Sequence, residues 1–357
     1  MGNAAEETSV TPGTANGMRL SVIVPARNEQ DCVGECLRSL VAQQEDGWRL
    51  GREWEILLVD DHSTDNTRRI AESIPGVTIM QAPPLEKGWT GKANAVWTGA
   101  QAANGAWLLF TDADTVHEPG SASRAIVEAE RHEAAMLSYS PRQIVKGFWQ
   151  RALMPLVFSE LAVTYPPAKV SDPDSHLAAA NGQFLLVRRD VYFANGGHRA
   201  VKDAVLEDVE LARAVKRRKQ GLRFRYAPEA VAVRMYRTLG AMLEGWTKNL
   251  ALLFGNTLAM AAWRVLDLLL IVGLPLLAWW TYGHTRFVVM WVALVLIWAR
   301  TLWRFYRRVA KSNFPFTDCL ISPVALPLFA VLLYRSWFQH TVTKRVSWKG
   351  REYVGGK

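Results

Sequence analysis

The chain has 357 residues, 50% of them hydrophobic, and a formal net charge of +9. This length accommodates one large α/β domain and a smaller appendage. The chain has three cysteines, with Cys32 and Cys36 one helical turn apart and Cys319 alone in the tail, and this odd, split set argues against a disulfide framework. No nucleic-acid-binding motif accompanies the positive charge, whose clusters lie beside apolar runs and favour a membrane flank over a nucleic-acid surface.

The beginning of the chain has no secretory signal. Residues 1–18 are rich in Glu, Thr, Gly, Ala and Asn, without a basic start followed by an apolar core. We therefore expect the first residues to be disordered and the following domain to stay in the cytosol.

Strands and helices alternate through the first half of the chain. Short apolar runs predict strands at 20–25, 54–59, 77–82 and 107–111, and helical spacing predicts helices at 31–44, 67–73 and 92–103. This alternation predicts a mostly parallel sheet with right-handed crossovers. Ligands of such open sheets bind at the carboxyl ends of the strands.

Acidic residues follow two of these strands. Asp60 and Asp61 end one strand, and Asp112 and Asp114 follow another. The alternate carboxylates of Asp112 and Asp114 can converge on Mg²⁺ or Mn²⁺ beside phosphate oxygens, although such residues also form turns. Asp61 and its neighbour can accept from a nucleotide base or ribose.

Polar loops precede two of the helices. The loop Pro25-Ala26-Arg27-Asn28-Glu29 can meet a nucleotide through backbone N–H groups and side chains. The segment from Lys87 to Lys92 has the wrong spacing for a Walker loop, but its glycines and lysines suit phosphate or sugar hydroxyl groups.

The second half contains a further acidic pair. We expect a strand at 181–187, a helix at 209–218 and a strand at 223–226. Glu207 and Asp208 immediately precede the helix, where the helix dipole alone would favour them. A carboxylate at this position can also take a proton from an acceptor hydroxyl group.

The tail contains three candidate membrane segments, at 268–285, 287–299 and 319–334. With the head inside, three crossings would place the basic C-terminus outside, against the positive-inside tendency. A re-entrant third segment or one interfacial segment would keep the C-terminus in the cytosol, which we prefer. A soluble helical core is the competing interpretation.

These motifs, in this order, resemble the inverting family 2 glycosyltransferases, whose nucleotide-binding domain has the GT-A fold. The resemblance covers about residues 19–250. It rests on SVIVPARNE, EILLVDDHSTDNT, GKANA, LLFTDADT, NGQFLLVRRDVYFANGGH and LEDVELARAVKRRKQG.

The resemblance implies a role for individual residues. Asp208 would be the general base, Asp112 and Asp114 would bind the metal, and Asp112 would also face the diphosphate. The implied nucleotide-sugar contacts are Pro25, Ala26, Glu29, Asp61, Lys92 and Asp112.

The sequence departs from the family in one element and resembles membrane-bound members in another. Processive synthases carry QxxRW after the base, whereas this chain has MLEGW, which keeps only Trp246 and favours a single transfer. The tail VSWKGREY is similar to the WKGR tail of transferases that act on ceramide, hopanoids or carotenoids, or is simply a basic membrane flank. If the tail is functional, Trp348, Lys349 and Arg351 contact diphosphate or acceptor, as Glu207 and Trp246 also could.

We therefore expect a disordered N-terminus (1–18), a GT-A domain (19–250), a transmembrane region with two or three helices (251–340) and a basic tail (341–357). The expected activity is metal-dependent transfer of one hexose from a nucleotide-sugar, preferably a UDP-sugar, to a lipid in the cell (inner) membrane, with a cytoplasmic active site. A processive polysaccharide synthase is the alternative enzyme. A non-catalytic membrane scaffold that binds nucleotide-sugar is the alternative of another class. The sequence does not indicate an oligomeric state.

Overall fold

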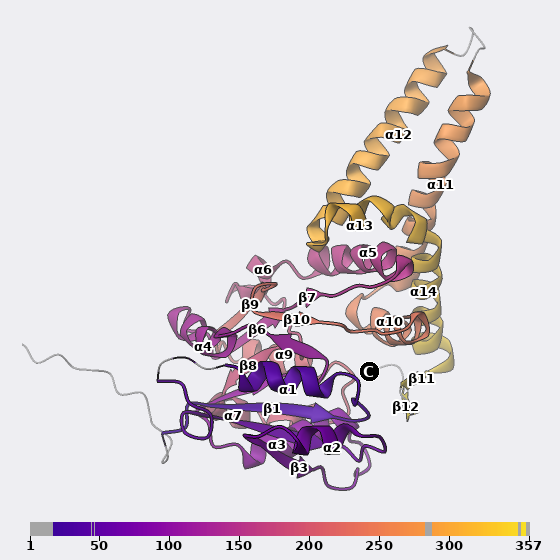
Figure 1. Ribbon diagram of the computed structural model, residues 1–357. Coiled ribbons are helices and arrows are strands. Elements are labelled where there is room, and N and C mark those ends of the chain that lie inside the picture. Colours follow the sequence, from indigo (N-terminus) through magenta and orange to yellow (C-terminus); the bar gives the residue numbers. More distant parts are fainter. Residues whose placement is uncertain (1–16, 44, 46, 283–287, 349–350, 355–357) are drawn as a thin grey trace, which may run out of the picture. The chain divides into compact units, whose positions relative to one another are not determined.

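The computed structural model describes residues 17–43, 45, 47–282, 288–348 and 351–354 (Figure 1). The chain forms two compact units. The first comprises Met1–Gln143 and Pro167–Val233, and the second comprises Ile144–Pro166 and Arg234–Lys357. Helix α10 (Leu239–Leu253), most of which lies before residue 250, thus belongs to the same unit as the apolar tail.

A mixed seven-stranded sheet forms the centre of the first unit, as the predicted α/β fold requires. Its order is β3-β2-β1-β4-β8-β6-β9, and β8 runs antiparallel to both of its neighbours. The strands are β1 (Leu20–Ala26), β2 (Trp54–Asp60), β3 (Val77–Gln81), β4 (Trp107–Phe110), β6 (Met136–Ser140), β8 (Leu185–Arg188) and β9 (Leu222–Tyr226). A small sheet adds β5 (Thr115–His117), β10 (Val231–Val233) and β7 (Arg142–Gln143).

Helices of this unit connect and cover the strands. They are α1 (Val33–Val41), α2 (Thr67–Glu72), α3 (Gly91–Ala102), α4 (Ser121–Arg131), α6 (Pro167–Ser171), α7 (Arg189–Ala194), α8 (Gly197–Ala200) and α9 (Glu207–Arg217). Alternate residues of β1 and β2, such as Val22 and Ile56, share a buried cluster with Leu37 and Leu40 of α1. The strands are nearly continuous apolar runs because both of their faces are covered.

The register of the sheet sets the position of the polar residues. In the parallel pairs, Ala26 lies opposite Asp60, and Ile23 lies opposite Phe110. The residues that follow β1, β2 and β4 therefore emerge at the same carboxyl edge.

The second unit is helical apart from one hairpin. It contains α5 (Phe148–Thr164), α10 (Leu239–Leu253), α11 (Thr257–Thr281), α12 (Val288–Val309), α13 (Phe316–Ile321), α14 (Leu326–Phe338), β11 (Arg345–Trp348) and β12 (Arg351–Val354), with short turns η2 (Ala310–Ser312), η3 (Ser322–Ala325) and η4 (Gln339–Thr343). Its core joins α5, α10 and α14 through Leu153, Trp246 and Phe329.

Three helical stretches are long and apolar enough to cross a membrane: Thr257–Thr281, Val288–Ser312 and Phe316–Thr343. In their most apolar windows, the first two bury only 17% and 11% of the residues, whereas the third buries 50%. The first stretch begins well before the predicted segment 268–285. The last residues of that segment, 283–285, lie outside the described part of the chain. The first stretch starts earlier because Arg264 and Asp267 are paired with each other at 3.1 Å and do not interrupt the helix.

Candidate active site

The loop after β1 is fastened to the loop after β2. Asp61 donates its backbone N–H to the Ala26 carbonyl at 2.8 Å, and the Arg27 guanidinium donates to the Asp61 carbonyl at 3.0 Å. The Glu29 backbone N–H donates to the Thr67 hydroxyl at 2.7 Å. The predicted nucleotide contacts Ala26, Glu29 and Asp61 therefore lie in one hydrogen-bonded assembly at the carboxyl edge.

Lys92 joins two carboxylates that are far apart in the sequence. Its ammonium group lies 2.8 Å from Asp112 Oδ1, after β4, and 3.0 Å from Glu207 Oε1, at the start of α9. Lys92 itself stands in the first turn of α3, where a helix dipole disfavours a cation. The attraction of these carboxylates accounts for a lysine at that position.

Asp208 completes this cluster from the first turn of α9. Its Oδ2 accepts from the Gly182 backbone N–H at 2.7 Å, and its Oδ1 accepts from the Val209 N–H at 2.8 Å. A Cβ atom on Gly182 would lie 3.0 Å from Lys92 Nζ and 3.5 Å from Asp208 Oδ2. Gly182 thus lets the lysine and the carboxylate approach the same stretch of backbone.

The electrostatics of the cluster change the proton affinity of its members. Burial, reinforced by the Glu207 carboxylate, raises the pKa of Asp208 to about 6, while Lys92 opposes the rise. Burial opposes protonation of Lys92, but Asp112, Glu207 and Asp208 together hold its pKa well above the ordinary value. A carboxylate with a pKa near 6 is close to the proton affinity that suits a general base at neutral pH.

A small cavity connects these groups. Pro25, Lys92, Asp112, Glu207 and Asp208 all contribute to its lining. His198 of α8 lines it too. Its Nδ1 is 2.8 Å from the Tyr192 hydroxyl, and burial, with a contribution from Lys92, lowers its pKa to about 3, so the ring is a neutral wall of the cavity.

Asp114 lies near the same strand end but does not line that cavity. The Thr115 hydroxyl and N–H both donate to the Asp112 carbonyl, so the segment forms the turn that the sequence left as an alternative. Both Asp114 and Asp112 act electrostatically on the Cys36 thiol, whose pKa burial raises to about 12. Cys36 is therefore an inert core thiol.

The charge of the cluster is compatible with a divalent cation. Among the described residues, no group of three His, Cys, Asp or Glu side chains is arranged to hold a metal ion by itself. Mg²⁺ and Mn²⁺ sites with phosphate ligands need only one or two carboxylates, however. Asp112, Glu207 and Asp208 against one lysine leave about two negative charges, which a divalent ion would balance.

The remaining predicted residues belong to the second unit. Trp246 is 2% exposed, and its ring packs against Phe158 and Tyr236 at centroid distances of 6.1 and 6.0 Å. Its side chain is buried within that core, which argues against the predicted contact of Trp246 with diphosphate or acceptor. Trp348 and Arg351 lie on β11 and β12, with side chains outside the described part of the chain, and Lys349 is itself outside it.

Comparison with known proteins shows what the chain is similar to. Residues 21–193 match the family model of glycosyl transferase family 2. The chain carries a family 2 glycosyltransferase domain. The chain is 26% identical over 351 residues to 4,4'-diaponeurosporenoate glycosyltransferase of Staphylococcus aureus strain USA300, covering 95% of this chain and 89% of the relative.

Two solved structures show a limited similarity to this glycosyltransferase. The mannosyltransferase PcManGT of Pyrobaculum calidifontis, solved with GDP-Man and Mn²⁺, gives a TM-score of 0.48 at 18% identity, with 94% of this chain and 90% of that chain covered. S. aureus TarS gives a TM-score of 0.45 at 15% identity, with 95% and 60% covered.

The family model of the glycosyltransferase ends at residue 193 and includes Pro25, Asp61, Lys92 and Asp112. Glu207 and Asp208 follow this match, so their connection to the matched part rests on geometry, namely the ion pair between Glu207 and Lys92.

Proposed function

We propose that this glycosyltransferase moves a single hexose from a UDP-sugar to a hydroxyl or carboxyl group of a membrane lipid, with inversion at the anomeric carbon. The observation that carries the proposal is the cluster in which Lys92 bridges Asp112 and Glu207 beside Asp208. It combines a cation, a phosphate-side carboxylate and a carboxylate with the proton affinity of a base.

Asp208 acts as the general base. Its carboxylate takes the proton of the acceptor oxygen while that oxygen forms a bond to the anomeric carbon. The bond from that carbon to the donor's diphosphate breaks, and its electron pair leaves with the nucleoside diphosphate. The two backbone N–H donors on Asp208, from Gly182 and Val209, hold the carboxylate in one orientation for this transfer.

The donor lies along the carboxyl edge of the sheet. Pro25, Ala26, Glu29 and Asp61 line the nucleotide side, where the Ala26–Asp61 and Glu29–Thr67 hydrogen bonds preorganise the loops. Lys92 and Asp112 contact the diphosphate side, with Glu207 positioning the lysine.

Asp112 and Asp114 would hold the Mg²⁺ or Mn²⁺ ion that neutralises the diphosphate leaving group. Before the donor binds, Lys92 supplies positive charge next to Asp112. Lys92 and Asp112 would then face the diphosphate and the cation on the same side of the site.

The lipid acceptor is supported by two observations. The curated relative, which spans most of the chain, is named for its action on 4,4'-diaponeurosporenoate. The chain also has three helices that are apolar enough to cross a membrane. We place the protein in the cell (inner) membrane with its active site in the cytosol, and we keep Trp348, Lys349 and Arg351 as contacts of the acceptor or the diphosphate.

A processive polysaccharide synthase is the alternative activity, and the length of the product distinguishes it. The absence of QxxRW at Met242–Trp246 favours one transfer. A single glycolipid adduct supports the proposal, whereas a ladder of oligomers would replace it.

The decisive experiment measures UDP release in membranes with Mn²⁺, together with UDP binding. We expect Asp208→Asn to reduce release by about 10²- to 10⁴-fold, which is the usual contribution of a general base, and to preserve UDP binding. Glu210→Gln, on the same helix but paired with Arg213 on its exposed side, is the matched control and should retain activity. Retained turnover in Asp208→Asn would reject this role. A wild-type protein that binds UDP but shows no turnover would favour the scaffold alternative.

A further inference from the structure

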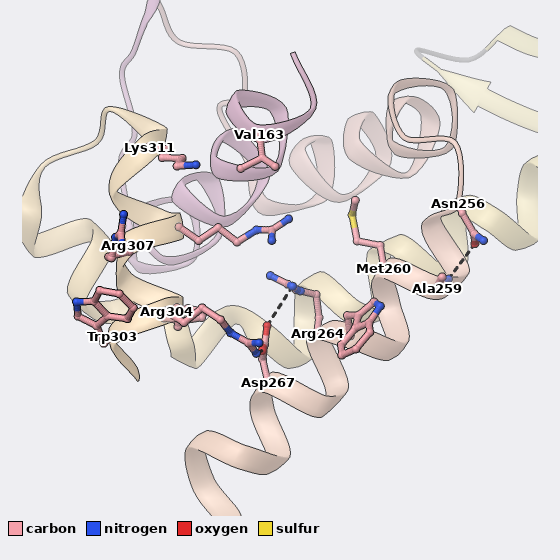
Figure 2. Close-up of a pocket in the computed structure, with 13 residues that line it drawn as sticks. Val163, Asn256, Ala259, Met260, Arg264, Asp267, Trp303, Arg304, Arg307 and Lys311 are labelled. Carbon is pink, nitrogen blue, oxygen red and sulfur yellow. Dashed lines mark hydrogen bonds and ion pairs between the residues drawn. The ribbon is translucent and has the colours of Figure 1, made fainter. Parts of the chain in front are cut away.

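A second cavity lies in the helical unit, at the end of the α11–α12 pair where α11 begins and α12 finishes (Figure 2). Its volume is about 660 Å³, within the range of small-molecule sites. We call it the basic pocket. It is lined by Val163, Asn256, Ala259, Met260, Trp263, Arg264, Asp267, Trp303, Arg304, Phe305, Arg307, Arg308 and Lys311.

Positive charge dominates the basic pocket. Five of the lining side chains are cationic, and Asp267 is the one carboxylate among them. The buried Glu160 carboxylate adds a second negative charge through its pairs with Arg264 at 3.0 Å and with Arg308. Five cations against two carboxylates leave an excess of three positive charges.

Part of this charge is not used by the protein's own ion pairs. Arg264, Arg304 and Arg308 are held by Glu160 and Asp267. In the described part of the chain, neither Arg307 nor Lys311 has a carboxylate partner; Arg307 lies over the Trp303 ring at 4.6 Å. Figure 2 shows both cations on the opposite side of the cavity from Asn256 and Met260.

The helix end and the aromatic rings add to the case for an anionic ligand. The pocket includes the first turn of α11, where Asn256 accepts from the Ala259 N–H and the helix dipole is positive. Trp263 and Trp303 are 58% and 59% exposed, as expected for rings at a membrane–water interface. The lining thus combines phosphate-binding cations with groups that face lipid.

We propose that the basic pocket binds the phosphate headgroup of an anionic membrane phospholipid. Arginine pairs with phosphate through two parallel N–H donors, and Lys311 adds a point charge. Basic pockets between membrane helices on the cytoplasmic side suit such headgroups, and the concentration of Arg and Lys at this end assigns it to the cytoplasmic side. The acyl chains would follow the exposed apolar faces of α11 and α12.

Headgroup binding requires membrane insertion of α11 and α12 but no turnover at Asp208, so a failure of either proposal leaves the other intact. The test uses the full chain purified in neutral detergent and native mass spectrometry with added phosphatidylglycerol or phosphatidylcholine. We expect a saturable adduct of one phosphatidylglycerol, retained at least about tenfold better than phosphatidylcholine. Both phosphates are ionised, but the choline cation of phosphatidylcholine cancels the charge that attracts the basic residues. Equal retention of the two lipids by the wild type would overturn the proposal without any variant.

The matched variants separate the pocket from general surface charge. Two basic residues contribute about 1 kcal/mol each to anionic-lipid attraction, so Arg307→Gln with Lys311→Gln should weaken retention by about 30-fold. Arg300→Gln, exposed on the same helix outside the pocket, should leave it unchanged. Equal weakening in both variants, or in neither, would overturn the assignment.

Two further probes identify the source of the anion. Glycerol phosphate that displaces phosphatidylglycerol at equal concentration would assign the pocket to a soluble phosphate and overturn the lipid proposal. Oleate that is retained as well as phosphatidylglycerol would assign it to a carboxylate and overturn the phosphate proposal. A pocket that keeps phosphatidylglycerol in the presence of glycerol phosphate, and that retains oleate less well, supports a phospholipid headgroup.

Discussion

At the scale of single residues, the charge of Asp208 connects activity to pH. Burial raises its pKa to about 6 from the ordinary value of 3.8. A base must be deprotonated to act, so we expect kcat/KM to fall about tenfold per pH unit below about pH 6 and to level off above it. Initial rates of UDP release across pH measure this limb, and a flat profile down to pH 5 would contradict it.

The stability contribution of the same carboxyl has the opposite sign. A raised folded-state pKa means that the folded protein holds the proton more tightly than the unfolded chain. Asp208 therefore favours folding most below about pH 4 and loses that contribution as pH rises through about 6. Protonation of Asp208 therefore does not unfold the protein, and a loss of activity towards pH 5 has to come from the lost base. A melting curve at each pH checks this.

Lys92 is the second residue with a measurable effect. Lys92→Met removes the cation that bridges Asp112 and Glu207. We expect kcat/KM to fall by about 10²-fold or more from lost charge stabilisation, and the acidic limb to move to higher pH because the opposing charge beside Asp208 is gone. Lys169→Met, which is exposed on α6, is the control. An unshifted limb would mean that Lys92 does not act on Asp208.

The sequence predicts which residues belong to this cluster, but it does not predict which of them contact one another. The strand-end position of Asp112 and the helix-start position of Asp208 follow from periodicity and from the parallel sheet. The salt bridge from Lys92 to Glu207 joins residues more than a hundred positions apart and depends on how α3 and α9 fold back to one edge. Local sequence carries no signal for that approach.

At the scale of elements, the close approach of Gly105 to β1 gives a stability prediction. A Cβ atom there would lie 2.4 Å from the Ser21 nitrogen and 2.5 Å from the Leu20 carbonyl carbon, which are backbone atoms of β1. Gly105→Ala should lower the free energy of unfolding by about 1–3 kcal/mol through overpacking. Gly240→Ala, with no neighbouring atoms within 4 Å in α10, should be neutral or slightly stabilising. Thermal unfolding of both variants measures this difference. A Gly105→Ala variant that unfolds at the wild-type temperature would refute the close packing.

A buried charge network ties three helices of the second unit. Glu160 of α5 is 1% exposed and pairs with Arg264 of α11 at 3.0 Å and with Arg308 of α12. Glu160→Gln leaves Arg308 without its carboxylate partner and Arg264 with Asp267 alone, and should cost about 3–5 kcal/mol. Asp190→Asn, which breaks an exposed pair with Arg188, should cost less than about 1 kcal/mol. Similar melting temperatures for the two variants would contradict a role for burial.

The same network explains where sequence interpretation of the elements was limited. Hydropathy predicts that the apolar segment begins at residue 268, because Arg264 and Asp267 count as charged. Their pairing with Glu160 and with each other lets α11 begin at Thr257. The partner Glu160 lies about a hundred residues earlier in the chain, so a local hydropathy window around Arg264 does not include it.

At the scale of the whole molecule, the third apolar stretch differs from the first two. Half of its most apolar window is buried, and it contains Pro323 and Pro327. The Ser336 hydroxyl accepts from the Ala251 N–H at 2.9 Å, and the His340 ring lies 2.8 Å from the Lys248 carbonyl. Both bonds attach the end of this stretch to α10, the helix that precedes the apolar tail.

The attachment to α10 favours one of the topologies that the sequence left open. A stretch whose distal end is bonded beside the entry to α11 does not carry the chain to the far side of the membrane. We therefore expect two crossings, α11 and α12, with the C-terminus in the cytosol, in agreement with the basic residues that follow.

Reporter fusions test this arrangement. A green fluorescent protein joined after Lys357 should fluoresce and an alkaline phosphatase at the same position should be inactive, because fluorescence requires the cytosol and phosphatase activity requires the outside. After Tyr282, at the end of α11, the two reporters should behave in the opposite way, which serves as the internal control. Active phosphatase after Lys357 would show a third crossing. In that case the hydrogen bonds from Ser336 and His340 to α10 could not persist in the membrane, and the basic tail could not approach a cytosolic active site.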